Sequence, residues 1–226
     1  MNNIYEIKLK INSPISFMMQ ELPCFDSIIA FCVYQDNKIK SDFHTPHGNE
    51  VIDYPLPIEK HESGIYLSSM MMFDEFVESC DSWKKRWENR FDHISDFGKA
   101  KRRVHTGSGK YKSYNMPVVI NSIGEVSFVF KGNKKEVERL INKHLYGIGK
   151  KVNTGFGWFD SFEIKECKKS KQYLIYYRPL NKEFVDHKDF MKVFPFKFKK
   201  IRKTYGGFYP PYWKFENMGN IFIPEI

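Results

Sequence analysis

The chain has 226 residues, of which 42% are hydrophobic, and a formal net charge of +9. This length is enough for one large domain or two small ones, and no apolar run approaches the roughly 18 residues that a membrane-spanning helix needs. Four cysteines without a C-x-x-C pair, and no signal-peptide pattern, indicate free thiols and a cytoplasmic protein. The basic excess points to a polyanionic partner without identifying it.

The first two predicted elements are a strand and a helix. Residues 4–11 alternate polar and apolar side chains, which is typical of a strand that buries every second residue from Tyr5 to Ile11. Pro23 stands where a helix can begin, and the mostly apolar stretch 23–34 predicts a buried helix.

Residues 36–110 are less regular and are interpreted as a long insertion. The stretch is polar to about Gly64, and residues 65–73 could then form a strand. A basic segment at 84–112 follows, with ten basic and three acidic side chains. Scattered surface lysines would spread the charge more evenly, so this segment is a candidate contact for phosphates.

Regular structure resumes after the insertion. Residues 113–121 and 125–132 are strand-like runs with a short glycine-containing link, which predicts a β-hairpin. Asn133 fits the N-cap of a helix, and residues 158–166 form a further strand. One stripe of this helix is apolar apart from a histidine: Val137, Leu140, Ile141, His144 and Leu145.

In order, the elements are strand, helix, insertion, strand, strand, helix and strand. Without the insertion this is the βαββαβ order of the ferredoxin-like fold, which RNA-recognition domains share. We therefore expect an α+β protein with a ferredoxin-like domain at residues 1–166, an insertion at about 36–110, and an extension at 167–226 packed on that domain.

The extension carries the second concentration of positive charge. Residues 188–203 hold seven basic side chains and one acidic side chain. They could bind phosphates, or they could form an amphipathic strand with Phe194, Phe196 and Phe198 in the core. The aromatic residues near the end of the chain could stack on bases, although core packing is favoured for most of them: Tyr205, Phe208, Tyr209, Tyr212 and Trp213.

A glycine-rich loop, GIGKKVNTGFG at 147–157, follows the last helix. Glycine is used where the backbone takes a positive φ or approaches another group closely, and exposed amides at such a turn can cup an anion. A helix C-cap and a tight turn would explain only one or two of its glycines. The candidate RNA-binding residues of the loop are Gly147, Gly149, Lys150, Lys151, Asn153, Thr154, Gly155 and Gly157.

A second candidate RNA-binding cluster lies at the end of the first basic segment. Its alternative is an ordinary solvated loop, although the glycines at 107 and 109 suit a segment that orders on binding. The cluster consists of Arg102, Arg103, His105, Lys110 and Lys112.

The glycine loop has the pattern GhGxxxxxGhG, with Ile148 and Phe156 at the hydrophobic positions. A loop of this pattern after the last helix of a ferredoxin-like fold is typical of the RAMP superfamily of CRISPR-associated proteins, and in this feature the chain resembles that superfamily. It also resembles the five-type backbone subunit of type IV-like and related class 1 effectors in SPISFMMQELPCFDSIIAF, in YPLPIEK before YLSSMMMF, in WKKRW and in PPYW. The resemblance covers most of the chain and is most specific over residues 111–166.

This resemblance implies a noncatalytic, RNA-binding structural subunit of a class 1 CRISPR effector ribonucleoprotein. It implies that residues 147–157 lie against the 5′ handle of the crRNA and that residues 60–110 hold a thumb that contacts the adjacent backbone subunit. The implied partners are the crRNA, the repeated backbone subunits and other effector subunits, with target nucleic acid as a further candidate and no membrane. Because residues 125–132 lack the full aromatic RNP signature, we expect loops rather than the sheet face to bind RNA.

The alternative is a RAMP endoribonuclease that processes precursor crRNA with a histidine assisting attack by a 2′-hydroxyl. His44 and His105 are the candidate catalytic residues, but no compact group of His, Tyr and Lys accompanies them. His44 and His47 could begin a metal site, yet the spacing places no third ligand. We therefore predict no metal and no cofactor.

Overall fold

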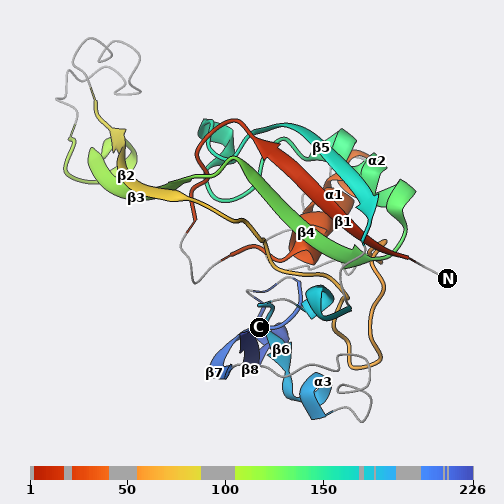
Figure 1. The fold of residues 1–226 in the computed structure, drawn as a ribbon. Coiled ribbons are helices and arrows are strands. Elements are labelled where there is room, and N and C mark those ends of the chain that lie inside the picture. Colours follow the sequence, from red (N-terminus) through yellow and green to blue (C-terminus); the bar gives the residue numbers. More distant parts are fainter. Residues whose placement is uncertain are drawn as a thin grey trace.

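The computed structural model shows an α+β protein whose described parts form three antiparallel sheets. In Figure 1 a central sheet has helices behind it, a two-stranded arm extends to one side, and a small C-terminal unit lies below. No helix in the described part of the chain is long and apolar enough to cross a membrane. The described residues are 3–17, 22–40, 55–87, 105–167, 171–175, 177–186, 200–210, 212 and 214–225.

The central sheet has β1 (Ile4–Ile11) between β4 (Glu125–Lys131) and β5 (Phe159–Glu166), antiparallel to both. Helices α1 (Phe25–Lys40) and α2 (Lys134–His144) cover one face of this sheet (Figure 1). The alternation predicted for β1 is confirmed, because its inward residues from Ile7 to Ile11 are buried while the lysines between them are exposed.

The core lies between this sheet and the two helices. Asn133 caps α2, and its side chain accepts a hydrogen bond from the amide of Glu136. The predicted stripe of α2 is confirmed, since Val137, Leu140, Ile141 and His144 are all buried. Each large apolar side chain removed from water in this way contributes about 1.5–3 kcal/mol.

The predicted hairpin between 113–121 and 125–132 is wrong. β3 (Tyr114–Ser122) pairs along its whole length with β2 (Val77–Lys85), whereas β4 pairs with β1. The reason is burial: β4 carries Val126, Phe128 and Phe130 into the core beside β1, while much of β3 is exposed. Pairing β4 with β1 therefore removes the most apolar surface from water.

Irregular chain covers the outer edge of β4. Single antiparallel bridges join Ile58 to Gly132, Ser68 to Phe130, and Met72 to Ser127. A side chain at Gly132 would place its Cβ 2.2 Å from the carbonyl oxygen of Pro57, so only glycine fits this crossing. The central sheet thus has three regular strands and an irregular fourth edge, and it differs in this from the regular ferredoxin-like sheet that we expected.

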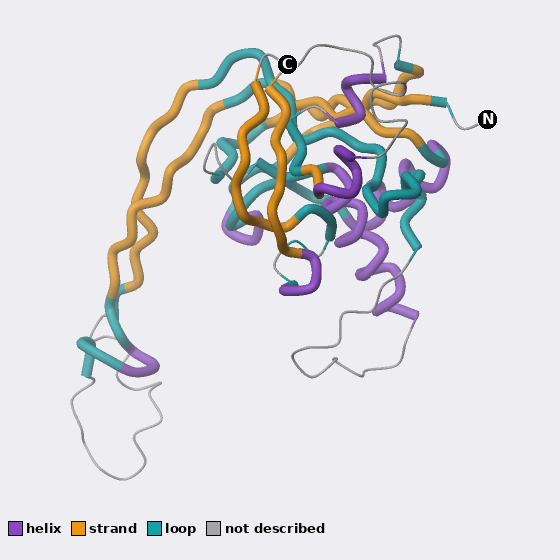
Figure 2. The backbone as a smooth tube through the Cα atoms, turned by 90° about the horizontal axis from the view of Figure 1, so that it is seen from below, coloured by secondary structure: helices purple, strands orange, loops and turns teal. Residues whose placement is uncertain are grey.

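The arm consists of β2 and β3 and extends away from the rest of the protein (Figure 2). Neither face of this ribbon is packed over its full length, and β2 is mostly exposed. Near its far end, a 3-10 turn at Gly109–Tyr111 leads back into β3, and the rings of Trp87 and Tyr111 lie 4.7 Å apart between centroids.

The C-terminal part contains β6 (Leu180–Asn181), α3 (Lys182–Asp186), β7 (Lys200–Gly207) and β8 (Met218–Glu225), in the sheet order β6-β8-β7. Residues 188–199, including Phe194, Phe196 and Phe198, lie outside the described residues. A second core joins this part to the segment that covers β4: Ile65, Leu67, Val129, Leu174, Ile175, Leu180 and Phe184.

A buried ionic cluster lies at this junction. Arg178 is fully buried and donates to the carboxylate of Asp26 in the first turn of α1 at 2.8 Å. It also donates to the carbonyl oxygens of Tyr66 and Ser68 and to the hydroxyl of Tyr212. Burial lowers the pKa of Arg178, but the Asp26 carboxylate together with the neighbouring Tyr212 and Cys24 holds the pKa above its ordinary value.

Candidate nucleic-acid interface

The glycine loop is held against the start of the chain by backbone hydrogen bonds. The amide of Gly157 donates to Pro14 at 2.9 Å, and the amide of Lys150 donates to Ser16 at 2.8 Å. The amide of Trp158 donates to the Ser13 hydroxyl at 2.8 Å. The loop is therefore a packed part of the fold with a defined shape.

Three of its glycines are required by this packing. A Cβ on Gly157 would lie 1.9 Å from the Ile148 carbonyl oxygen, and one on Gly147 would lie 2.7 Å from the Gly157 carbonyl oxygen. Gly149 has a φ of +93° and would meet Ile15. These glycines shape the loop. Gly155, with a φ of +96°, has no atom within 4 Å of its Cβ position, so only its backbone angle favours glycine.

The polar side of the loop faces outward. Lys150, Lys151, Asn153 and Thr154 are all exposed, as is the backbone of Gly149. The Thr154 hydroxyl donates to the carbonyl oxygen of Lys151 at 2.8 Å, which tightens the turn. The loop thus has an exposed rim, formed by Lys150, Lys151, Asn153 and Thr154, on a base that packs against the start of the chain.

Beside the rim lies a groove of about 800 Å³ between α1 and the end of α2. Phe31 of α1 and Tyr146 line it, with 49% and 73% of their surfaces exposed. Lys143, Lys150 and Lys151 line the same groove. Exposed rings beside ammonium groups suit a ligand with flat apolar faces and negative charge, which is the chemistry of single-stranded nucleic acid.

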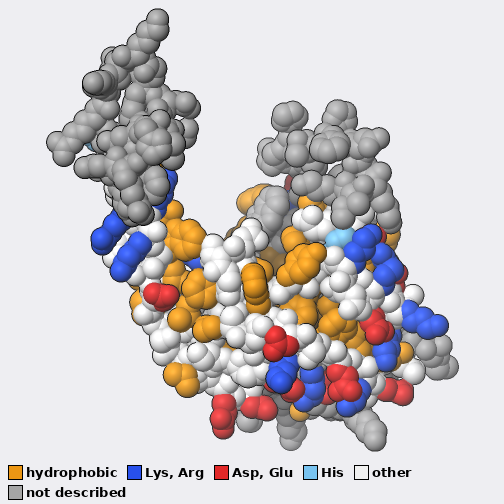
Figure 3. All heavy atoms as spheres, turned by 90° about the horizontal axis from the view of Figure 1, so that it is seen from above, with side chains coloured by type: hydrophobic (Ala, Val, Ile, Leu, Met, Phe, Trp, Pro, Cys, Tyr) orange, Lys and Arg blue, Asp and Glu red, His pale blue; other side chains and the backbone are white. Residues whose placement is uncertain are grey.

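Exposed hydrophobic side chains also gather on the face that Figure 3 shows, beside the root of the arm.

The two helices that form the groove are joined by Asp36 of α1, whose side chain is only 4% exposed. Asp36 accepts from Lys143 at 2.7 Å, from His144 Nε2 at 2.9 Å and from Arg139 at 2.9 Å. This network fixes the walls of the groove.

The glycine loop also contacts the arm. The Nζ of Lys151 lies 4.2 Å from the ring centroid of Trp83 in β2, and the Trp83 indole donates to the Tyr114 hydroxyl at 2.9 Å. Such a cation–π contact is worth about 0.5–1 kcal/mol at an exposed site. Loop and arm therefore form one continuous surface.

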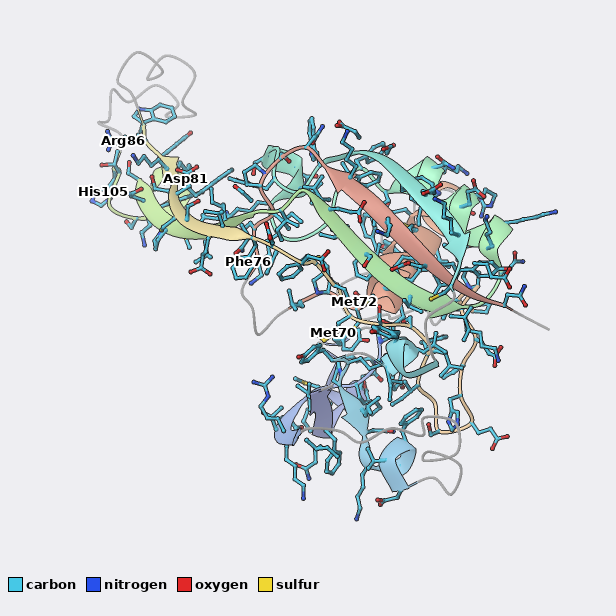
Figure 4. All side chains as sticks on the ribbon, viewed as in Figure 1. Met70, Met72, Phe76, Asp81, Arg86 and His105 are labelled. Carbon is cyan, nitrogen blue, oxygen red and sulfur yellow. The ribbon has the colours of Figure 1, made fainter. Side chains whose placement is uncertain are left out.

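Only part of the second predicted cluster lies within the described residues. Arg102, Arg103 and His44 lie outside the described residues, and the side chain of Lys110 is likewise not described. His105 and Lys112 are exposed, and Figure 4 places His105 and Arg86 towards the far end of the arm. The His105 Nδ1 lies 3.3 Å from the Ser108 hydroxyl.

The open face of the central sheet is unsuited to base stacking. The aromatic residues Phe128 and Phe130 of β4 are fully buried in the core. The open face instead carries a balanced set of charges, with ion pairs between Lys8 and Glu125 and between Lys165 and Glu163, each at 2.7 Å. This face of β4 therefore offers no ring on which a base could stack.

A model of the family described as CRISPR type IV associated protein Csf3 matches residues 4–224. The chain belongs to this family. The predicted resemblance to CRISPR-associated proteins is thereby confirmed, and membership of the Csf3 family supports a place in a CRISPR effector complex. None of the curated proteins compared with this Csf3-family chain matches it.

Among solved structures, the Csf3-family chain is similar to one chain of the "Cryo-EM structure of the Type III-B Cmr-beta bound to cognate target RNA". The identity is 11% and the TM-score is 0.36 over 73% of this chain. The match spans 61% of the length of that chain. A likeness of this size says nothing about function.

Three important residues of this Csf3-family protein were not found from the sequence. Phe31 falls within a helix that is apolar on most sides, which hides the single ring that faces solvent. Tyr146 could have been noticed, since it stands between an amphipathic helix and the glycine loop. Arg178 lies in the extension, and no local pattern marks a residue whose partners Asp26 and Ser68 are more than 100 positions away.

Proposed function

We propose that this protein is an RNA-binding structural subunit of a type IV CRISPR effector and that it caps the 5′ handle of the crRNA at the glycine-loop groove. The observation that carries this proposal is the combination of an exposed lysine rim with the two solvent-facing rings of Phe31 and Tyr146 in one groove.

Each part of the groove has a distinct role in this proposal. The ammonium groups of Lys150 and Lys151 neutralise phosphates, and the side chains of Asn153 and Thr154 offer hydrogen bonds to the backbone of the RNA. Phe31 and Tyr146 stack on unpaired bases. Gly147, Gly149, Gly155 and Gly157 set the shape on which these contacts depend.

For the fold, we propose a ferredoxin-like domain at residues 1–166 in which irregular residues 66–72 replace one edge strand. Residues 167–226 form an extension packed on it. The arm of β2 and β3 is the thumb, and it contacts the adjacent repeated backbone subunit. Its far end, with Lys112 and His105, adds phosphate contacts. The other effector subunits and the target nucleic acid are further partners.

The proposal is tested by fluorescence anisotropy of the full chain with a labelled RNA of the CRISPR repeat from the same locus. Changing both Lys150 and Lys151 to Ala should lower affinity and reduce the slope of log K against log salt by roughly 1.4, since each single-strand phosphate contact contributes about 0.7. Tyr146→Ala should weaken binding roughly fivefold or more.

Lys165→Ala is the matched control, because it removes an exposed lysine from the open sheet face. It should leave both affinity and slope close to wild type. If Lys165→Ala lost about half as much affinity and slope as the double variant, binding would follow net charge alone, and the groove would then not be the site.

A further inference from the structure

The strand β7 is the described end of the chain's second basic segment. Residues 200–207 hold three basic side chains and no carboxylate. In the order β6-β8-β7, β7 is an edge strand of the C-terminal sheet (Figure 1). Its side chains from Ile201 to Tyr205 are all exposed. A basic strand that is open to solvent in this way suits a polyanionic ligand.

One face of the ribbon formed by β7 and β8 combines a cation, two rings and an amide. Alternate residues of a strand share a face, as do residues directly opposite each other on neighbouring strands. Lys203 lies opposite Phe222, and Tyr205 lies opposite Asn220. Tyr205 is 59% exposed, and Asn220 is exposed as well. We call these four residues the ribbon platform.

The ammonium group of Lys203 lies over the ribbon platform. Its Nζ is 5.6 Å from the centroid of the Phe222 ring, and within the described residues it forms no ion pair. Arg202 lies on the other face of the ribbon, where it lines a separate hollow together with Asp74 and Glu75. The ribbon platform therefore does not include Arg202, and its positive charge comes from Lys203.

The ribbon platform offers the three kinds of contact that an unpaired nucleotide can make. Lys203 can neutralise a phosphate, the ring of Tyr205 can stack on a base, and the amide of Asn220 can hydrogen-bond to a base edge. Two residues along a strand span about 6.6 Å, so these groups are close enough to act on neighbouring nucleotides. Lysine on an edge strand also discourages pairing with other sheets, but that role does not require an exposed ring beside it.

We propose that the ribbon platform is a second nucleic-acid site, which binds an unpaired strand by stacking on Tyr205 and by a phosphate contact with Lys203. The proposal does not rest on RNA binding at the glycine loop, because the ribbon platform shares no residue with the lining of that groove. Unpaired RNA and unpaired DNA present the same phosphates and stacking faces, and the probes of the test distinguish them.

The test uses fluorescence anisotropy of the full chain with a labelled oligouridine of about 15 nucleotides, in a background that carries Lys150→Ala and Lys151→Ala. Tyr205→Ala should weaken binding roughly fivefold or more, whereas Tyr205→Phe, which keeps the ring, should bind as the background does. Lys203→Ala should reduce the slope of log K against log salt by about 0.7. Oligothymidine of the same length shows whether the site prefers RNA or accepts either strand.

Lys135→Ala is the matched control, because Lys135 is exposed on α2 and, like Lys203, forms no ion pair within the described residues. It should leave affinity and slope close to those of the background, and thermal melting of each variant checks the fold. Three outcomes would overturn the proposal: no binding of either oligonucleotide by the background protein, unchanged binding in Tyr205→Ala, or equal losses in Lys135→Ala and Lys203→Ala. Binding of repeat RNA by the variant with Lys150→Ala and Lys151→Ala bears only on the proposed function, so the two failures are distinguishable.

Discussion

At the scale of single residues, burial determines the reactivity of two cysteines. Cys24 and Cys32 are buried, and loss of solvent raises the pKa of each thiol to about 12. Thiols react as thiolates. These two should therefore be inert in the folded protein, whereas Cys80 on the arm is exposed.

In a titration of the native protein with a chromogenic disulfide, we expect Cys80 to react fastest and the partly buried Cys167 to react more slowly. Cys24 and Cys32 should react only after denaturant is added. Cys80→Ser should remove the fast phase without changing the melting temperature. Rapid native labelling of Cys24 or Cys32, located by peptide mapping, would contradict the burial seen here.

The same pKa shifts make stability depend on pH at the alkaline end. An unfolded thiol loses its proton near pH 8.5, while the folded thiols keep theirs to about pH 12. The unfolded chain thus binds fewer protons in this window, so the free energy of unfolding falls as pH rises, by about 1.4 kcal/mol per pH unit per thiol. Urea titrations of wild type and Cys32→Ala between pH 8 and 10 should show a shallower fall in the variant.

At the scale of elements, the glycine loop shows that one motif can serve both folding and binding. Gly147 and Gly157 are buried where backbone passes close to backbone, while the lysines between them face solvent. The spacing of the glycines therefore indicates the shape of the loop, whereas the chemistry of its ligand is inferred from the exposed side chains and the adjacent rings.

Two glycine variants separate these contributions. Gly155→Ala and Gly157→Ala both place a side chain at positive φ, but only Gly157→Ala drives a Cβ into the Ile148 carbonyl. Gly155→Ala should cost about 1 kcal/mol of stability, and Gly157→Ala at least about 3 kcal/mol. Denaturant unfolding measures both costs, and equal costs would show that the close approach to Ile148 relaxes freely.

At the scale of the whole molecule, the ionic cluster of Arg178 joins the C-terminal part to the first helix. Asp26, Arg178 and Tyr212 come from segments that are far apart in the sequence and meet in a space from which water is excluded. Burial raises the pKa of Tyr212 well above its ordinary value, so its hydroxyl stays protonated and donates to Asp26. Arg178 thus connects the core beneath the central sheet to the second core at the C-terminal part.

Arg178→Met should lower the free energy of unfolding by about 3–5 kcal/mol, because it leaves the Asp26 carboxylate buried without its cation. Lys8→Met breaks the exposed pair with Glu125 and should change stability by no more than about 1 kcal/mol. Adding Asp26→Asn to Arg178→Met should recover part of the loss. Urea denaturation checks all three, and a loss of less than about 1 kcal/mol in Arg178→Met would mean that the cluster does not couple the two cores.

The sequence by itself determined the elements whose signal is local. Alternation in residues 4–11, the cap at Asn133 and the stripe of α2 all depend on neighbours within a few positions, and each is confirmed. The glycine pattern sufficed for a family resemblance that the match over residues 4–224 confirms.

Only the tertiary structure decided which strand pairs with which and which side chains meet. β4 pairs with β1, its more apolar neighbour, and β3 pairs with β2 instead. The short link between β3 and β4 does not show which of these pairings buries more apolar surface. Phe31 of α1 meets Tyr146 and the adjoining glycine loop from a segment more than 100 positions away. The glycine loop was visible in the sequence, but its groove and its contact with Trp83 depend on long-range packing, which local patterns do not encode.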